Sequence, residues 1–119
     1  MAKHDKLGKY GEQLAVDHLL DKNYKILERN YRFDRAEIDI LAQKDGILAV
    51  VEVKTRSSVD YGNPAEFVKP KQIKNLVKAV NHYIEVRQLD IETRFDIISI
   101  TKSGQSYSVE HIENAFYHF

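Results

Sequence analysis

The chain has 119 residues, of which 43% are hydrophobic and 30% are charged, and its 18 basic and 18 acidic side chains balance to zero net charge. This composition is that of one ordinary globular domain covering residues 1–119, and the neutral balance argues against a protein that coats nucleic acid by bulk attraction. The absence of cysteine excludes disulfide bonds and thiolate metal sites. Because "MAKHDKLGKYGE" contains no apolar leader and no run is long enough to cross a bilayer, we expect a cytoplasmic protein without membrane contact.

The first half of the chain predicts one helix followed by three strands. Apolar residues recur at steps of three and four over residues 5–22, which is the pattern of an amphipathic helix with one buried stripe. The β-forming run 24–33 predicts a strand. Residues 36–43 and 47–55 predict two more strands, and the glycine in Lys44-Asp45-Gly46 is typical of a tight hairpin between them.

The second half predicts a helix and two further strands. The polar stretch "SSVDYGNP" reads as a loop that ends at Pro64, and residues 65–68 as a helical turn. Pro70 suits the first position of a longer helix, whose apolar stripe of period 3.6 runs from Ile73 to Ile84. Residues 93–101 and 107–112 predict strands joined by a turn at 102–105. The order α-β-β-β-α-β-β indicates an α/β fold with helices packed on a mixed sheet.

Four charged side chains, Glu37, Asp39, Glu52 and Lys54, lie inside the apolar runs of the predicted hairpin. Side chains alternate faces along a strand, so Glu37 and Asp39 share one face, as do Glu52 and Lys54. If the strands pair about Asp45-Gly46, position 39 lies across from position 52, with Cβ atoms about 5 Å apart. Asp39 and Glu52 should then be neighbours, and Glu37 and Lys54 should form the next cross-strand pair.

Two carboxylates held this close repel each other unless a cation lies between them. Mg²⁺ fits this position because it prefers oxygen ligands and keeps several waters. Lys54, on the same face, would then orient or deprotonate a water, or stabilise the charge of a phosphoryl transition state. The alternative is an ordinary solvated hairpin with a Glu37–Lys54 salt bridge, although that alternative leaves the Asp39–Glu52 pair unexplained.

The charge distribution is locally uneven. From Lys69 to Lys78 there are four lysines and no acidic residue, and from Lys22 to Arg35 there are five basic residues against two acids. Such local basic faces are compatible with phosphate contacts, although a solvated helix face is the commoner cause. Arg94 and Asp96 flank Phe95 on one strand and are expected to brace the sheet, and the five histidines show no metal-ligand spacing.

Four ordered stretches resemble one bacterial family. The stretches "GKYGEQLAVDHLLDKNYKILERNYR", "EIDILA", "VVEVKTRSSVDYGNPAEFV" and "RFDIISI", which span roughly residues 7–112, look like the YraN-like (UPF0102) proteins. That family resembles the PD-(D/E)XK nuclease superfamily and is similar to Holliday-junction resolvases. The resemblance implies a restriction-endonuclease-like core of order α-β-β-β-α-β, with a mixed central sheet flanked by helices.

The resemblance also implies roles for individual residues. Asp39 and Glu52 would bind Mg²⁺ or Mn²⁺ together with the backbone carbonyl of Val53, and Lys54 would be the catalytic lysine. Glu12 would join the metal ligands, as the corresponding acid does in archaeal Holliday-junction resolvases. The other interpretation of Glu12 is a surface helix residue, although the small Gly11 beside it favours close approach of this helix to the sheet.

Further residues have roles that stay open. Glu37, within the Glu-Ile-Asp motif, would supply an outer carboxylate, and Arg56 would hold a phosphate or be a simple strand-end charge. The start of the second long helix would face nucleic acid or the site through Lys71, Gln72 and Lys74, although solvated helix ends have the same composition. Ala36 stands where the family usually has glycine, and Ile38 replaces the superfamily's proline. No residue that the metal chemistry requires is missing.

The implied function is a metal-dependent DNA endonuclease that hydrolyses phosphodiester bonds in branched or single-stranded DNA. The neutral overall charge favours a homodimer or another partner that supplies further DNA contacts. One alternative is a catalytically silent adaptor that keeps the nuclease fold and binds nucleic acid or protein. Another is a structural module whose basic helix binds a second protein without any dependence on metal.

Overall fold

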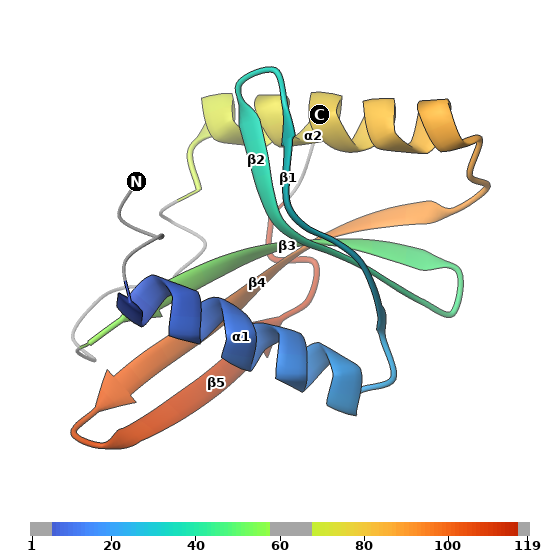
Figure 1. Cartoon of the computed structure of the whole chain (residues 1–119). Coiled ribbons are helices and arrows are strands. Elements are labelled where there is room, and N and C mark those ends of the chain that lie inside the picture. The colour runs from blue at the N-terminus through green and yellow to red at the C-terminus, as the bar shows by residue number, and fades with distance from the viewer. Residues whose placement is uncertain (1–5, 58–67, 117–119) are drawn as a thin grey trace.

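The computed structural model describes residues 6–57 and 68–116, and its helices and strands follow the predicted order (Figure 1). They are α1 (Lys6–Asp21), β1 (Lys25–Phe33), β2 (Ala36–Lys44), β3 (Ile47–Arg56), α2 (Pro70–Arg87), β4 (Glu92–Ser103) and β5 (Ser106–Ile112). The predicted α/β class and element order are therefore confirmed. Residues 65–67 of the helical turn predicted at 65–68, and nearly all of the polar loop before it, lie outside the described residues.

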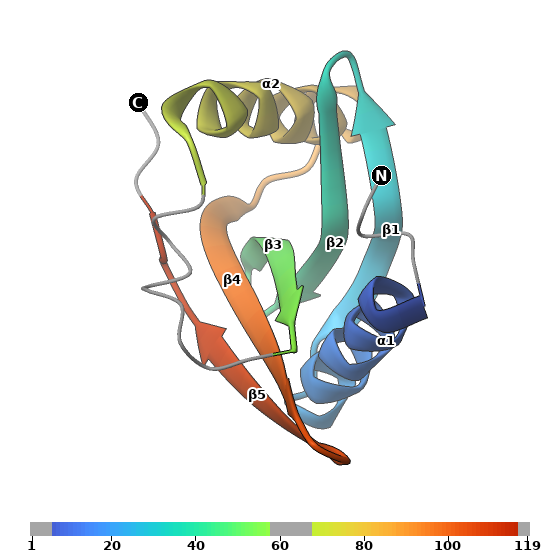
Figure 2. The ribbon, with the colours of Figure 1, turned by 90° about the vertical axis from the view of Figure 1, so that its left-hand side faces the viewer.

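The five strands form one mixed sheet whose spatial order is the order of the sequence. The β1–β2, β2–β3 and β4–β5 neighbours run antiparallel, whereas β3 and β4 run parallel. A parallel pair needs a crossover connection, and α2 lies within that connection. Figures 1 and 2 show α1 against one face of the sheet and α2 against the other.

Each face of the sheet buries its own hydrophobic cluster. On the α1 face the helix contributes Ala15, Val16 and Leu19, and β3 contributes Ala49, Val51 and Val53. On the α2 face the helix contributes Leu76, Ala79, Val80 and Tyr83, and the central strands contribute Leu48, Val50, Phe95 and Ile97. Because β3 and β4 are covered on both sides, both faces of these strands are apolar, as in other sheets buried between helices.

Pro70 begins α2, as predicted. Proline is tolerated in the first helical turn because the N–H that it lacks would have no partner inside the helix. The helix ends at Arg87, and the left-handed backbone conformation of Gln88 caps it. The N–H of Gln88 donates to the Glu85 carbonyl, and the N–H of Leu89 donates to the Ile84 carbonyl. Within residues 6–57 and 68–116, neither helix combines the length and apolarity needed to cross a bilayer.

Candidate metal and nucleic-acid site

The β2–β3 hairpin has the register that its turn residues predict. Ile40 pairs with Val51 and Lys44 pairs with Ile47, so the strands are symmetric about Asp45 and Gly46. Both turn residues have positive φ angles, 51° at Asp45 and 77° at Gly46. A two-residue hairpin turn of this type requires such angles, because its twist must match the twist of the flanking strands.

The β2–β3 ladder ends one residue before the predicted Asp39–Glu52 pair. Its last pair joins Ile40 to Val51. Beyond that point β2 stays paired with β1 as far as Ala36, while β3 continues beside β4 to Arg56. The two strands therefore diverge, and Figure 1 shows the β1–β2 hairpin turning toward α2 as β3 runs on with β4. We call the point of divergence, between Asp39 on β2 and Val53 on β3, the fork.

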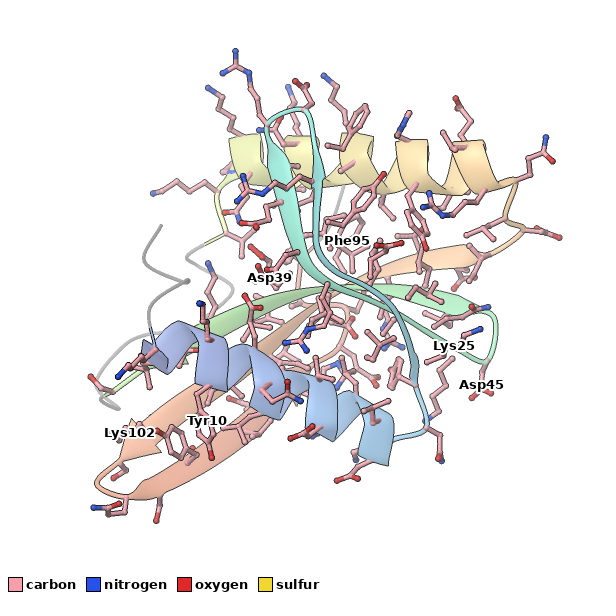
Figure 3. The ribbon with its side chains drawn as sticks, in the orientation of Figure 1. Tyr10, Lys25, Asp39, Asp45, Phe95 and Lys102 are labelled. Atoms are coloured by element: carbon pink, nitrogen blue, oxygen red, sulfur yellow. The ribbon has the colours of Figure 1, made fainter. Side chains whose placement is uncertain are left out.

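Asp39 occupies the fork (Figure 3). Its Oδ2 accepts a hydrogen bond of 2.8 Å from the backbone N–H of Val53. The whole residue is buried, with only 1% of its surface exposed. The carboxylate thus replaces the ladder bond that β2 no longer supplies to Val53. Because the N–H and C=O of one strand residue point toward the same edge, the Val53 carbonyl also points toward the Asp39 side.

The divergence corrects three details of the hairpin prediction, the first of which is that Asp39 and Glu52 are not ladder partners. Ile38 packs with Leu41 on the α2 face, whereas Ile40 packs on the α1 face. Strict alternation along β2 would place Ile38 and Ile40 on the same face, so the alternation is broken here. The predicted Glu37–Lys54 cross-strand pair is also wrong: Glu37 is the ladder partner of Arg32, and their charged groups lie 3.3 Å apart. Regular alternation and pairing need two strands that stay adjacent, and β2 leaves β3 before either can continue.

Glu52 lies on the opposite side of the fork and faces α2. The residue is only 3% exposed, and its Oε2 accepts a hydrogen bond of 2.5 Å from the side-chain N–H of Gln72. The structure thus brings the predicted polar residue of the α2 start into direct contact with a predicted ligand. Lys71 and Lys74, on the same helical turn, are exposed.

Glu12 approaches from the other face of the sheet. It lies on α1 and is 5% exposed, so the interpretation of Glu12 as a surface residue is wrong. A Cβ atom on the neighbouring Gly11 would lie 2.1 Å from the Thr55 hydroxyl oxygen, which is shorter than any tolerable contact. Glycine at this position therefore allows α1 to pack closely on β3 beside the fork, as its size predicted.

Three of the acidic residues predicted for the site, namely Glu12, Asp39 and Glu52, are thus buried. One carboxylate oxygen of Glu12 and one of Glu52 are completely shielded from solvent. Burying an ionised carboxylate costs several kcal/mol unless a cation or a set of hydrogen bonds compensates. The same carboxylates are the hard oxygen ligands that Mg²⁺ and Mn²⁺ prefer.

Asp39 and Glu52 offer the carboxylate oxygens that a magnesium ion prefers, and such an ion takes its remaining ligands from outside the protein. In the part of the chain that the structure describes, no three Asp, Glu or His side chains are already arranged as a metal-ligand group. Mg²⁺ typically uses one or two protein carboxylates and fills its other positions with waters and substrate phosphate oxygens. Asp39 and Glu52, with the Val53 carbonyl, are the residues that would hold the ion.

Lys54 and Arg56 lie on the part of β3 that continues beyond the fork beside β4. Both are partly exposed, and they pair with Ser99 and Thr101 of β4. Because each follows Glu52 at an even spacing, their side chains leave the strand on the same side as Glu52. The structure therefore places two positive charges in line with the buried carboxylate.

A fourth buried acid, Asp96, belongs to a separate network on the α1 face. Burial alone would raise the pKa of Asp96, but hydrogen bonds from His111, from Arg94 and from the backbone N–H of Asn114 outweigh it and lower that pKa. Arg94 also donates to the Tyr24 hydroxyl. These contacts agree with the predicted bracing role of Arg94 and Asp96, since they join β4 to β5, to Asn114 just after it, and to Tyr24, the residue directly before β1.

The comparisons with known proteins agree with the motifs. The family model described as "Uncharacterised protein family UPF0102" matches residues 11–100. The chain is 59% identical to a UPF0102 protein of Flavobacterium johnsoniae over the full length of both. It is 48% identical to a UPF0102 protein of Geobacter metallireducens, covering 98% of this chain and 97% of that protein. The chain therefore belongs to the UPF0102 family, the YraN-like group that its four motifs resemble.

Proposed function

We propose that the protein is a Mg²⁺- or Mn²⁺-dependent DNA endonuclease whose active site lies at the fork. The observation that carries the proposal is the hydrogen bond between Asp39 and the Val53 backbone, 2.8 Å long. It fixes one buried carboxylate beside the residue that directly follows the second, Glu52. A pair of buried carboxylates at a break in the sheet has little structural value, whereas a metal ion would compensate their charges.

The residues of the fork divide the work by their chemistry. A bound metal would supply positive charge that polarises the phosphodiester and makes water a better nucleophile. Asp39, oriented by Val53, and Glu52, oriented by Gln72, would hold that ion in a fixed position. Lys54 carries a positive charge on the same side of β3 and would donate to a phosphoryl oxygen as negative charge develops there.

Basic side chains beside the fork give DNA a route to it. Lys71, Lys74 and Lys78 are exposed on α2, close to the Gln72–Glu52 contact, and Arg35 is exposed at the end of the β1–β2 hairpin. The Lys78 ammonium lies 3.6 Å from the Asp34 carboxylate, which brings that hairpin end against α2. We call these four basic residues the basic rim. A rim of this size on a neutral chain supports modest, salt-dependent binding, which a homodimer would strengthen.

The proposal is tested by cleavage of a DNA panel that contains four-way junctions, flaps, single strands and duplexes. We expect wild-type protein to cut at least one form with Mn²⁺ or Mg²⁺ and to cut none in EDTA. Asp39→Asn and Lys54→Ala should both lose cleavage. The matched controls are Asp45→Asn and Lys25→Ala, because Figure 3 places both residues at the far end of the β2–β3 hairpin from Asp39. The proposal fails if no DNA form is cut at high protein concentration, or if Asp39→Asn cuts as well as wild type.

One observation favours a second candidate function. Because no three-ligand metal group is assembled within the described residues, the fold is also suited to a silent adaptor that binds nucleic acid through the basic rim. Such an adaptor would bind DNA equally well in EDTA and in Mg²⁺, and Asp39→Asn would leave its affinity unchanged. Electrophoretic mobility shifts under the two conditions therefore separate the adaptor from the nuclease.

A further inference from the structure

A cavity of about 460 Å³ lies on the α1 face, away from the fork. It is lined by His18, Lys22, Tyr24, Lys44, His111 and Glu113. His18 lies about 9 Å further along α1 than Glu12, at 1.5 Å per residue. Lys44 lies about 17 Å along β2 from Asp39, at roughly 3.3 Å per residue. The cavity is therefore a separate feature from the carboxylates of the proposed nuclease site.

The two histidines of the cavity face each other through their ring nitrogens. His18 Nε2 and His111 Nδ1 are 3.3 Å apart, although the residues are 93 positions apart in the sequence. The His111 side chain is only 9% exposed, and its other nitrogen, Nε2, lies 2.8 Å from Asp96 Oδ2. One of the facing nitrogens therefore belongs to the buried His111 ring, which Asp96 holds in place, and the other belongs to the half-buried His18.

Asp96 determines which nitrogen of His111 carries the proton. Arg94 pairs with this carboxylate at 2.8 Å and keeps it ionised, so it only accepts hydrogen bonds. A neutral His111 ring therefore donates from Nε2 to Asp96 and has its lone pair on Nδ1, the nitrogen that lies 3.3 Å from His18 Nε2. Neutral imidazoles are the form that binds metal ions.

The spacing of the two nitrogens matches a tetrahedral metal centre. Zn–N bonds are about 2.0–2.1 Å long, and two nitrogens at the tetrahedral angle on one ion are then about 3.3–3.4 Å apart. The observed separation is 3.3 Å. Histidine ligands of zinc also commonly donate their second N–H to a carboxylate, and the His111–Asp96 contact has this arrangement.

The charges around the cavity are mixed. Glu113 lines it with a side chain that is 61% exposed and that lies 3.7 Å from Arg94. Lys22 is exposed, and the Lys44 ammonium lies over the Tyr24 ring, 5.3 Å from its centroid. Solvent screens the repulsion that an exposed ammonium exerts on a cation. Glu113 adds an oxygen donor at the mouth of the same cavity.

We propose that His18 and His111 form a binding site for a borderline divalent transition-metal ion of the Zn²⁺ class, distinct from the fork. Asp96 acts as a positioning residue that holds the His111 ring, and Glu113 or water fills a further coordination position. Mg²⁺ does not compete here, because nitrogen ligands favour zinc, cobalt, nickel and copper over magnesium. The two-histidine set leaves open positions toward the cavity.

The test uses Co²⁺ as a spectroscopic probe and Zn²⁺ as the competitor. Tetrahedral Co²⁺ absorbs visible light far more strongly than octahedral Co²⁺, so the spectrum reports the geometry of the site directly. We expect wild-type protein to give a tetrahedral spectrum that one equivalent of Zn²⁺ removes. His18→Asn should weaken binding by more than about 100-fold, since even the loss of an orienting carboxylate costs about 10- to 100-fold. Asp39→Asn should bind as wild type does.

His18→Asn is the preferred variant because His18 makes no hydrogen bond to Asp96, so the substitution leaves the Asp96 network in place. The circular dichroism spectrum and the metal-free melting temperature of the variant verify that it folds. Glu113→Gln, at an exposed position, is a second variant that should weaken binding by a smaller factor. The proposal is overturned if His18→Asn binds Co²⁺ with unchanged affinity and spectrum, or if wild type gives only an octahedral spectrum. Loss of the signal in Asp39→Asn would also overturn it, because the ion would then lie at the fork.

Discussion

Neutralising a carboxylate at the fork should stabilise the metal-free protein. In Asp39→Asn the amide oxygen can still accept the hydrogen bond from Val53, which is 2.8 Å long in the wild type. The negative charge that it removes lies beside Val53, the residue that directly follows Glu52, and both acidic residues are buried, at 1% and 3% exposure. At about 6 Å and an effective dielectric constant of about 20, the repulsion between two such charges is roughly 3 kcal/mol.

The expected gain in unfolding free energy is smaller than that repulsion. Replacing a charged acceptor by a neutral one weakens the bond to Val53 by about 1 kcal/mol. The net stabilisation in EDTA should therefore be about 1–2 kcal/mol, which raises the melting temperature by roughly 4–8 °C for a domain of this size. Scanning calorimetry in EDTA measures the shift, and Asp45→Asn in the exposed hairpin turn is the matched control.

Adding metal should make the wild type more stable than Asp39→Asn, which reverses the order of stability expected in EDTA. Wild type should gain about 2.7 kcal/mol when Mg²⁺ or Mn²⁺ is present at 100 times its dissociation constant, because the ion binds only the folded state. Asp39→Asn should gain almost nothing under the same conditions. The reasoning is refuted if Asp39→Asn is less stable than wild type in EDTA, which would make the carboxylate a structural brace, or if metal leaves the wild type unchanged.

Three further predictions concern packing, the Asp96 network and DNA binding. Gly11→Ala should destabilise the protein by about 1–2 kcal/mol in urea unfolding despite the better helix propensity of alanine, because its Cβ would lie 2.1 Å from the Thr55 hydroxyl. Adding Thr55→Ala to the same chain should recover part of this loss. Full tolerance of Gly11→Ala would contradict the close contact between α1 and β3. Asp96→Asn should cost about 3 kcal/mol in urea unfolding, because it removes the nearer and fully buried of the two carboxylates that pair with the Arg94 guanidinium. A loss below about 1 kcal/mol would show that the network does not brace the sheet. Replacing Lys71 and Lys74 together by alanine should reduce the slope of log binding constant against log salt by about 2 on duplex DNA, whereas an unchanged slope would place the DNA elsewhere.

The sequence predicts the hairpin well because its determinants are local. Asp45 and Gly46 adopt the positive φ angles of a two-residue turn, and that turn fixes which residues of β2 and β3 face each other. The prediction fails at Glu37 and Ile38 because β2 leaves β3 there, and the divergence depends on how the β1–β2 hairpin packs toward α2. Such packing involves residues distant in the chain, which no local pattern encodes.

The site residues also divide into those that local sequence predicts and those that depend on packing between distant segments. The motif identifies Asp39, Glu52 and Lys54 by their spacing, and Gly11 indicates that Glu12 lies close to the sheet. The contact between Gln72 and Glu52 was only one of two interpretations, because it depends on how α2 is rotated against β3. The approach of His18 to His111 had no sequence signal, since it joins the end of α1 to β5 across 93 positions.

The most direct test of the central claim is cleavage of a four-way DNA junction with Mn²⁺ by wild-type protein, Asp39→Asn and the control Asp45→Asn, with products resolved on a denaturing gel. The fork as a catalytic site predicts cut strands with wild type and Asp45→Asn, and intact strands with Asp39→Asn or EDTA. If a form from the wider DNA panel is the better substrate, the same three proteins are compared on it. Cleavage that survives Asp39→Asn, or no cleavage of any form by wild type, would contradict the account.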